Sequence, residues 1–309
     1  MSSTVPAELV RAARETVAPF REHYPFEPHW FQGSGGWLHH LDEGPRDAAP
    51  MLCLHGNPSW SFAWRGLVAR FGDRMRIVAP DHLGCGLSEK PQDWSYRLED
   101  HIRHVEELVE HLDLRDITLV VHDWGGAIGM GFATRHPDRV ARLVITNTAA
   151  FPGGAMPTRI AMCRIPVAGE LVVRGLNGFA RAATHMAVER PLPAPVRRAY
   201  VAPYRGWRSA IATHRFVVDI PTAQSHPSYS TLAGIDAGLE RLAEHPAMLL
   251  WGERDWCFTP AFRMEWLKRF PRARVEILPR AGHYLFEDEP EAFGRAIEGF
   301  LESPEPAPL

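Results

Sequence analysis

Apolar residues form short runs along the chain, and these runs alternate with stretches of helical spacing. Runs typical of buried strands lie at residues 51–56, 76–81, 117–123, 140–148, 247–253 and 275–279. Helical spacing occurs near residues 61–70, 99–112, 124–136, 261–270 and 290–302. Near-continuous Val, Ile and Leu strands between helices indicate a parallel sheet with helices on both faces.

Two further segments precede the first run. EPHWFQ and GWLHHLDEG, between about residues 28 and 43, flank the sequence GSGG. This arrangement predicts an antiparallel hairpin at the edge of the sheet. With the six runs it gives a mostly parallel, eight-stranded α/β fold. Residues 7–17 predict a short surface helix.

The alternation stops near residue 151. Residues 151–230 contain helical stretches separated by Pro and Gly, without a clear buried strand. We therefore expect a helical cap at 151–230, inserted between a first part of the α/β core at 1–150 and a second part at 231–309.

Net charge and composition narrow the range of possible partners, cofactors and cellular locations. The chain has 309 residues and a formal net charge of −3, which gives no indication of a nucleic-acid partner. Its four cysteines show no zinc spacing, and no G-x-G-x-x-G loop is present, so we expect neither a metal nor a cofactor. Without a signal-peptide pattern or a long apolar run, we expect a cytoplasmic protein.

The cap carries a different charge from the core. Residues 151–220 contain ten arginines, no lysine and three acidic residues. This bias is typical either of a solvated helical surface or of a docking face for an acidic partner or an anionic membrane.

The sequence VVHDWGGAIG places Asp123 between a buried strand and a helix that begins with paired glycines. This is the strand–turn–helix context of a nucleophile elbow. A carboxylate is ionised near neutral pH and attacks an electrophilic carbon without a base. We therefore expect Asp123 to be a nucleophile rather than only a helix cap.

Two loops supply partners for Asp123. His283, in AGHYLFED after the last strand, is the candidate base. Asp255, in WGERDWC, is the candidate acid that orients His283, with Glu253 as runner-up. The loop after residues 140–148 contains no carboxylate, which favours Asp255.

Two neutral donors are expected near Asp123. Asn57 in HGNPSW offers an amide N–H, and Trp124 offers an indole N–H. Such donors stabilise a halide or an oxyanion without neutralising the nucleophile. Their backbone amides are an alternative source of the same hydrogen bonds.

In this order, HGNPSWSFAWR, DHLGCGLSEKP, VVHDWGG, WGERDWC and AGHYLFED resemble the haloalkane dehalogenase branch of the α/β-hydrolases. HGNPSWSF, DHLGCGLS and NTAAFP are most similar to the β-lactone decarboxylases of long-chain olefin biosynthesis.

The resemblance implies conversion of a cis-β-lactone with two long alkyl chains into a cis-olefin and CO2. It implies that Asp123 is the nucleophile, that His283 and Asp255 are its partners and that Asn57 and Trp124 are donors. It also implies a small hydrophobic substrate and assembly with the ligase and reductase of that pathway. The basic cap is then a candidate surface for that assembly or for peripheral membrane contact.

Other functions are compatible with the same nucleophile elbow at Asp123. Hydrolysis of a haloalkane needs the same Asp, His and donor pair. Epoxide hydrolysis usually needs two cap tyrosines, for which Tyr200, Tyr204 and Tyr229 are available. Asn57 stands where epoxide hydrolases usually carry an aromatic residue. A non-catalytic binding protein is disfavoured because every candidate of the triad is present.

Overall fold

The structure is a computed structural model that describes residues 4–154 and 156–303. Its sheet has eight strands in the order β1-β2-β4-β3-β5-β6-β7-β8. The strands are β1 (His29–Gly33), β2 (Gly36–Glu43), β3 (Pro50–Leu54), β4 (Arg76–Pro80), β5 (Ile117–His122), β6 (Val140–Thr146), β7 (Ala247–Gly252) and β8 (Arg274–Leu278).

The predicted sheet is confirmed. β1 and β2 form the antiparallel hairpin, and β2 also pairs antiparallel with β4. All other neighbouring strands are parallel. Every residue of β3, β5 and β7 is buried, which explains why their sequences are uninterrupted apolar runs. The last strand, β8, alternates between exposed and less exposed positions, as expected of an edge.

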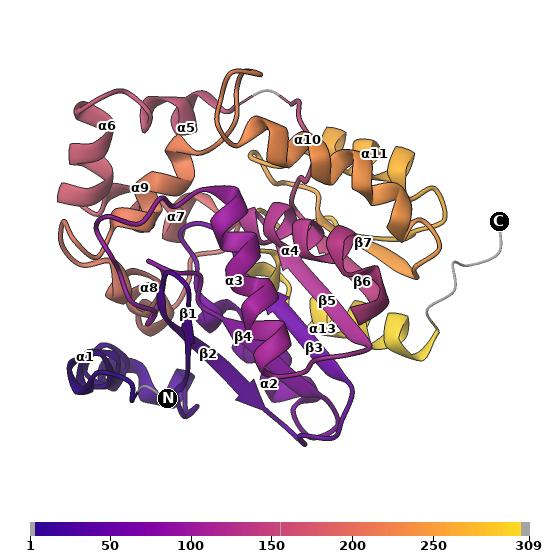
Figure 1. Cartoon of the computed structure of the whole chain (residues 1–309), viewed down its shortest axis with the longest axis horizontal. Helices are drawn as coiled ribbons and strands as arrows, with labels where there is room; N and C mark the ends of the chain where they lie inside the picture. Colours follow the sequence, from indigo (N-terminus) through magenta and orange to yellow (C-terminus); the bar gives the residue numbers. More distant parts are fainter. Residues whose placement is uncertain (1–3, 155, 304–309) are drawn as a thin grey trace.

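Helices cover both faces of the sheet. α3 (Leu98–His111) packs against α4 (Trp124–Arg135), and Figure 1 shows both in front of the strands. α13 (Pro290–Glu302) lies behind them and packs against α2 (Arg65–Phe71). The remaining core helices are α1 (Ala7–Val17), η1 (Ala18–His23), η2 (Ser61–Trp64), η3 (Pro137–Arg139), η6 (Leu239–Leu242), α11 (Pro260–Arg269) and α12 (Leu285–Asp288).

Between β6 and β7 the chain is helical. Before η6, the elements are α5 (Thr158–Met162), α6 (Ala168–Glu170), η4 (Leu171–Gly175), α7 (Gly178–Met186), α8 (Ala194–Val201), η5 (Ala202–Tyr204), α9 (Ile211–Val218) and α10 (Tyr229–Gly238). Residues 151–154 and 156–230 contain no strand.

α10 contacts α3 and α4 and so lies on the core. We propose that 151–230 is the cap and that 1–150 and 231–309 are the two parts of the core. Within the described ranges, no helix has the length and apolar character needed to cross a membrane.

Candidate active site

Five adjacent parallel strands each place one polar residue at their carboxyl ends. Asn57 follows β3, Asp123 follows β5, Asn147 follows β6, Asp255 follows β7 and His283 follows β8. Carboxyl ends of parallel strands meet at one edge of a sheet, so distant segments of the chain form a single site.

Asp123 occupies the tip of a sharp turn between β5 and α4. Its φ of 52° lies in the left-handed region, which is strained for a residue with a side chain. The glycines that follow make this turn possible, because a Cβ on Gly125 would overlap the carbonyl of Leu54 and one on Gly126 would overlap the hydroxyl of Thr148. That hydroxyl donates to the backbone carbonyl of Asp123.

The Asp123 carboxylate is buried and held by backbone donors. Its Oδ1 accepts a hydrogen bond of 2.6 Å from the N–H of Asn57. Burial raises the pKa of Asp123, whereas His283 and the backbone N–H groups of Asn57 and Trp124 lower it. Burial is the larger effect, so the pKa lies above the ordinary value of 3.8.

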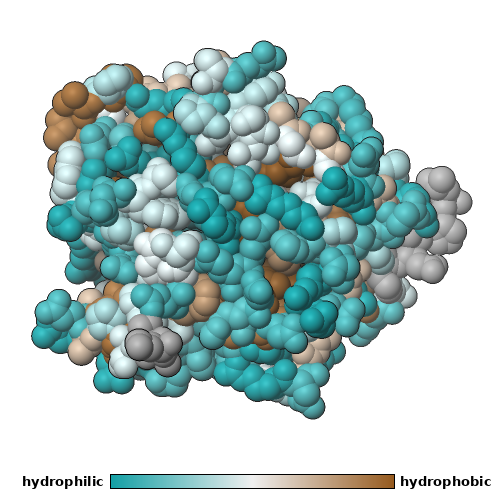
Figure 2. All heavy atoms as spheres, in the orientation of Figure 1, coloured by the Kyte–Doolittle hydropathy of each residue, from teal (hydrophilic) through white to brown (hydrophobic). Residues whose placement is uncertain are grey.

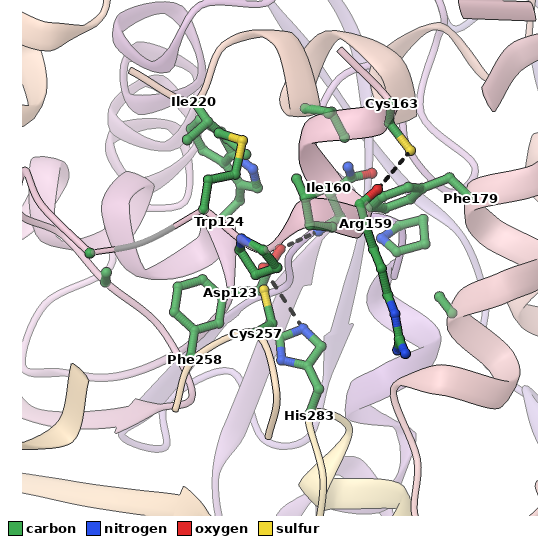
Figure 3. Close-up of a pocket in the computed structure, with 18 of the residues that line it drawn as sticks. Asp123, Trp124, Arg159, Ile160, Cys163, Phe179, Ile220, Cys257, Phe258 and His283 are labelled. Carbon is green, nitrogen blue, oxygen red and sulfur yellow. Dashed lines mark hydrogen bonds and ion pairs between the residues drawn. The ribbon is translucent and has the colours of Figure 1, made fainter. Parts of the chain in front are cut away.

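His283 lies between two carboxylates. Its Nδ1 is 2.8 Å from Oδ2 of Asp255. Its Nε2 is 3.8 Å from Oδ2 of Asp123, and Figure 3 marks this second contact. Burial alone would lower the pKa of His283, but the charge of Asp255, its hydrogen bond and the charge of Asp123 raise it above 6.5. The hydrogen bond to Asp255 fixes the proton on Nδ1 and turns Nε2 toward Asp123.

Neighbouring rings hold His283 in this orientation. His122 Nε2 donates to the backbone carbonyl of His283 over 2.9 Å. Burial lowers the pKa of His122 well below its ordinary value, so this ring is neutral. The ring of Phe258 stacks on the imidazole with centroids 5.8 Å apart.

Asn147 is a supporting residue that the sequence did not reveal. Its Nδ2 donates to Oδ2 of Asp255 over 2.9 Å, and its Oδ1 accepts from the N–H of Gly252 over 2.8 Å. The N–H of Cys257 donates to the other oxygen of Asp255 over 2.6 Å. The only signal for Asn147 was its position directly after a buried strand. Glu253 instead pairs with Arg263.

The two predicted side-chain donors differ in their surroundings. Nδ2 of Asn57 donates to the carbonyl of Thr213 in the cap over 3.0 Å, which leaves its second hydrogen unused. The ring of Trp124 packs against Phe216, with centroids 5.1 Å apart. Asn57 and Trp124 both line a cavity beside Asp123.

A cavity of about 1310 Å³ opens above Asp123. Ile160, Val172 and Phe179 of the cap line it, together with Trp124 and Phe258 of the core. Asp123, Arg159 and His283 are the acidic and basic side chains among its lining residues, and Figure 3 shows Asp123 and His283 turned toward each other. The arrangement therefore presents a buried carboxylate to a large, mainly apolar space.

Some apolar cap residues lie outside the cavity. Leu171 and Leu176 are largely exposed and do not line it, and Phe216 packs against Trp124. In residues 4–154 and 156–303, no group of three His, Cys, Asp or Glu side chains is placed to hold a metal ion.

Known proteins share this sequence and architecture. The family described as alpha/beta hydrolase fold matches residues 49–166. A cis-3-alkyl-4-alkyloxetan-2-one decarboxylase of Xanthomonas campestris pv. campestris is 44% identical over 276 residues, which cover 86% of this chain and 92% of that protein. A protein of the same name from Shewanella oneidensis is 40% identical, with 90% and 89% covered.

Haloalkane dehalogenases are less similar to this chain in sequence. Haloalkane dehalogenase 2 of Mycobacterium tuberculosis is 35% identical, with 89% of this chain and 94% of that protein covered. The crystal structure of haloalkane dehalogenase DbeA from Bradyrhizobium elkani has a TM-score of 0.82 at 29% identity, with 90% and 98% covered. The chain therefore belongs to the α/β-hydrolase family, in the haloalkane dehalogenase-like branch that also contains the cis-3-alkyl-4-alkyloxetan-2-one decarboxylases.

Proposed function

We propose that the chain is a cis-3-alkyl-4-alkyloxetan-2-one decarboxylase, which converts a cis-β-lactone with two long alkyl groups into a cis-olefin and CO2. The observation that carries the proposal is the identity of 40–44% to two proteins of that name, against 35% to the dehalogenase. The large apolar cavity above Asp123 supports it, because two hydrocarbon chains need such a space.

The atom balance indicates which bond Asp123 attacks. The released CO2 contains the ring oxygen and the carbonyl oxygen, so the bond between the ring oxygen and ring carbon 4 must break. We infer that the Asp123 carboxylate displaces the ring oxygen from carbon 4. The products of this step are an ester on Asp123 and a free carboxylate on carbon 3. A dehalogenase makes the same type of displacement, with halide as the leaving group.

The second step regenerates the enzyme without water. The bond between carbon 3 and the carboxylate breaks, and its electron pair forms the double bond between carbons 3 and 4. The ester bond to Asp123 breaks at the same time and returns a carboxylate. Displacement inverts carbon 4, and anti elimination then keeps the two alkyl groups cis, so the route accounts for a cis-olefin.

The other site residues have defined roles in this route. Trp124 and the second amide hydrogen of Asn57 donate to the carboxylate that develops in the first step. His283, charged between Asp255 and Asp123, stabilises Asp123 as it leaves in the second step. In a dehalogenase route, His283 would instead deprotonate the water that attacks the ester.

Haloalkane hydrolysis is the second candidate, supported by the same triad and by the dehalogenase relatives. Epoxide hydrolysis has less support. The hydroxyl of Tyr200 donates to Glu287 and that of Tyr204 donates to the carbonyl of Ser59, and neither residue lines the cavity. Of the three cap tyrosines, Tyr229 alone lines it.

The proposal also covers the cellular location, the substrate class and the partner proteins of the enzyme. We expect a cytoplasmic protein that takes a small hydrophobic substrate and assembles with the ligase and reductase of olefin biosynthesis. Co-purification of the three proteins tests this assembly.

One experiment separates the two reactions. Purified protein is given a long-chain cis-β-lactone or a 1-bromoalkane, and gas chromatography and a bromide assay follow the products. Alkene from the wild type and none from Asp123→Asn is the expected result. Bromide and alcohol without alkene would make the protein a dehalogenase.

A further inference from the structure

The cap carries a patch of exposed apolar side chains, the cap patch, formed by Met162, Ile165, Val167, Leu171, Val172 and Leu176. Each is between 47% and 71% exposed. Figure 2 shows apolar atoms gathered on the part of the surface where Figure 1 places α6. Contiguous exposed apolar surface on a globular protein marks an interaction site.

Val167 is the most exposed residue of the cap patch, at 71%, and has a φ of 64°. A β-branched side chain is strained in this left-handed conformation. Neither local conformation nor packing in the described structure favours Val here. The backbone strain and the solvent exposure of this apolar residue suggest that its side chain is buried in another environment.

The cap patch is continuous with the active-site cavity. Met162, Ile165 and Val172 are exposed on the surface and also line the cavity. A hydrocarbon chain that enters the cavity through this part of its wall therefore passes over apolar side chains.

Basic side chains accompany the cap patch. The three acidic residues of 151–220 each pair with an arginine, as Glu170–Arg174, Glu189–Arg254 and Asp219–Arg97. Of the ten cap arginines, only Arg174 pairs with a described acidic residue, which leaves a strong positive excess. Arg159 and Arg164 flank Met162 in the sequence; Arg159 is exposed and Arg164 is partly exposed.

We propose that the cap patch docks this protein on the surface of an anionic lipid bilayer. The apolar side chains enter the boundary between headgroups and acyl chains, and the cap arginines contact the anionic headgroups. The cavity then opens toward the lipid, from which a hydrocarbon substrate enters. This entry route rests on the proposed function, whereas the docking itself does not.

A lipid surface explains the combination better than an acidic protein does. Headgroups and acyl chains offer negative charge directly above an apolar layer, so a single surface would match both the cap arginines and exposed apolar residues such as Val167 and Leu171. An acidic protein surface would complement the arginines and leave the exposed apolar residues unmatched.

Sedimentation with vesicles tests the docking. The wild type is expected to bind vesicles of equal parts phosphatidylcholine and phosphatidylglycerol, less at high salt, and to bind pure phosphatidylcholine weakly. The double variant Leu171→Asp, Leu176→Asp is expected to lose about tenfold in partition to the anionic vesicles. Met264→Asp, equally exposed on α11 outside the cap patch, is the matched control and keeps wild-type binding.

Two further variants separate docking from folding and catalysis. Val167→Gly removes the side chain that strains this positive φ, so it is expected to raise the melting temperature while weakening vesicle binding. Asp123→Asn is expected to bind vesicles as the wild type does.

The docking proposal is overturned if the wild type does not sediment with anionic vesicles or if the double variant binds them equally well. A wild-type dimer that the double variant breaks, without any vesicle binding, would instead identify the cap patch as a self-association surface.

Discussion

The cavity has two walls of opposite character. At the sheet edge, Asp123, Asp255 and His283 are buried, and backbone or side-chain hydrogen bonds hold each of them. Across the cavity, cap residues such as Met162 and Ile165 are largely exposed. In the proposed function, the sheet edge carries out the displacement at carbon. The cap, with its apolar residues, then determines which molecule reaches Asp123 and from where.

The largest expected effect is the difference in activity loss between variants of Asp123 and of His283. In the water-free route, Asp123→Asn removes the attacking group and is expected to lower alkene formation by at least ~10⁴-fold. His283→Gln removes a stabilising charge rather than a base, and its expected loss is about ten- to a hundredfold. Initial rates of alkene formation from the lactone measure both. Equal losses in the two variants would mean that His283 takes part in a required proton transfer.

The turn that holds Asp123 should tolerate little change. Gly126→Ala places a methyl group against Thr148 and is expected to destabilise the protein by about 2–3 kcal/mol. Gly234→Ala, in α10 with no atom near the new Cβ, is the matched control and should stabilise it by about 0.5–1 kcal/mol. Unfolding by urea measures both variants. A neutral Gly126→Ala would show that the turn is less tightly packed than its contacts indicate.

The difference between the sheet edge and the cap also explains which features could be predicted from the sequence. Strand ends are local features, so the position of Asp123 after β5 and of His283 after β8 followed from apolar runs and glycines. The support that Asn147 gives to Asp255 depends on two strands distant in sequence, and no local pattern contains it. The orientation of the cap helices is also a tertiary property, so no local pattern shows that Leu171 and Leu176 lie on the surface whereas Phe179 lines the cavity.

The charge between the two aspartates should make stability depend on pH. The pKa of His283 is raised in the folded protein by Asp255 and Asp123, so the folded state binds this proton more tightly than the unfolded chain does. Its contribution to stability is complete below about pH 6.5 and is lost as the pH rises through the folded pKa. Urea unfolding across this range should show stability falling with pH in the wild type and a flatter profile in His283→Gln. An identical slope in both would contradict the raised pKa.

The smallest effect should come from the cap wall. Phe179 lines the cavity with an apolar side chain that carries no charge and no proton to transfer, so Phe179→Ala should leave the turnover of a short-chain lactone unchanged. It should change the preference between lactones of different chain length by about fourfold, equivalent to one buried methylene at ~0.8 kcal/mol. Competition between two lactones, followed by gas chromatography of the olefins, measures this preference. Met264→Ala, exposed on α11 and outside the cavity, should change neither quantity. If Phe179→Ala slowed both substrates as much as His283→Gln does, the cap would share in the chemistry, and the division between the two walls would fail.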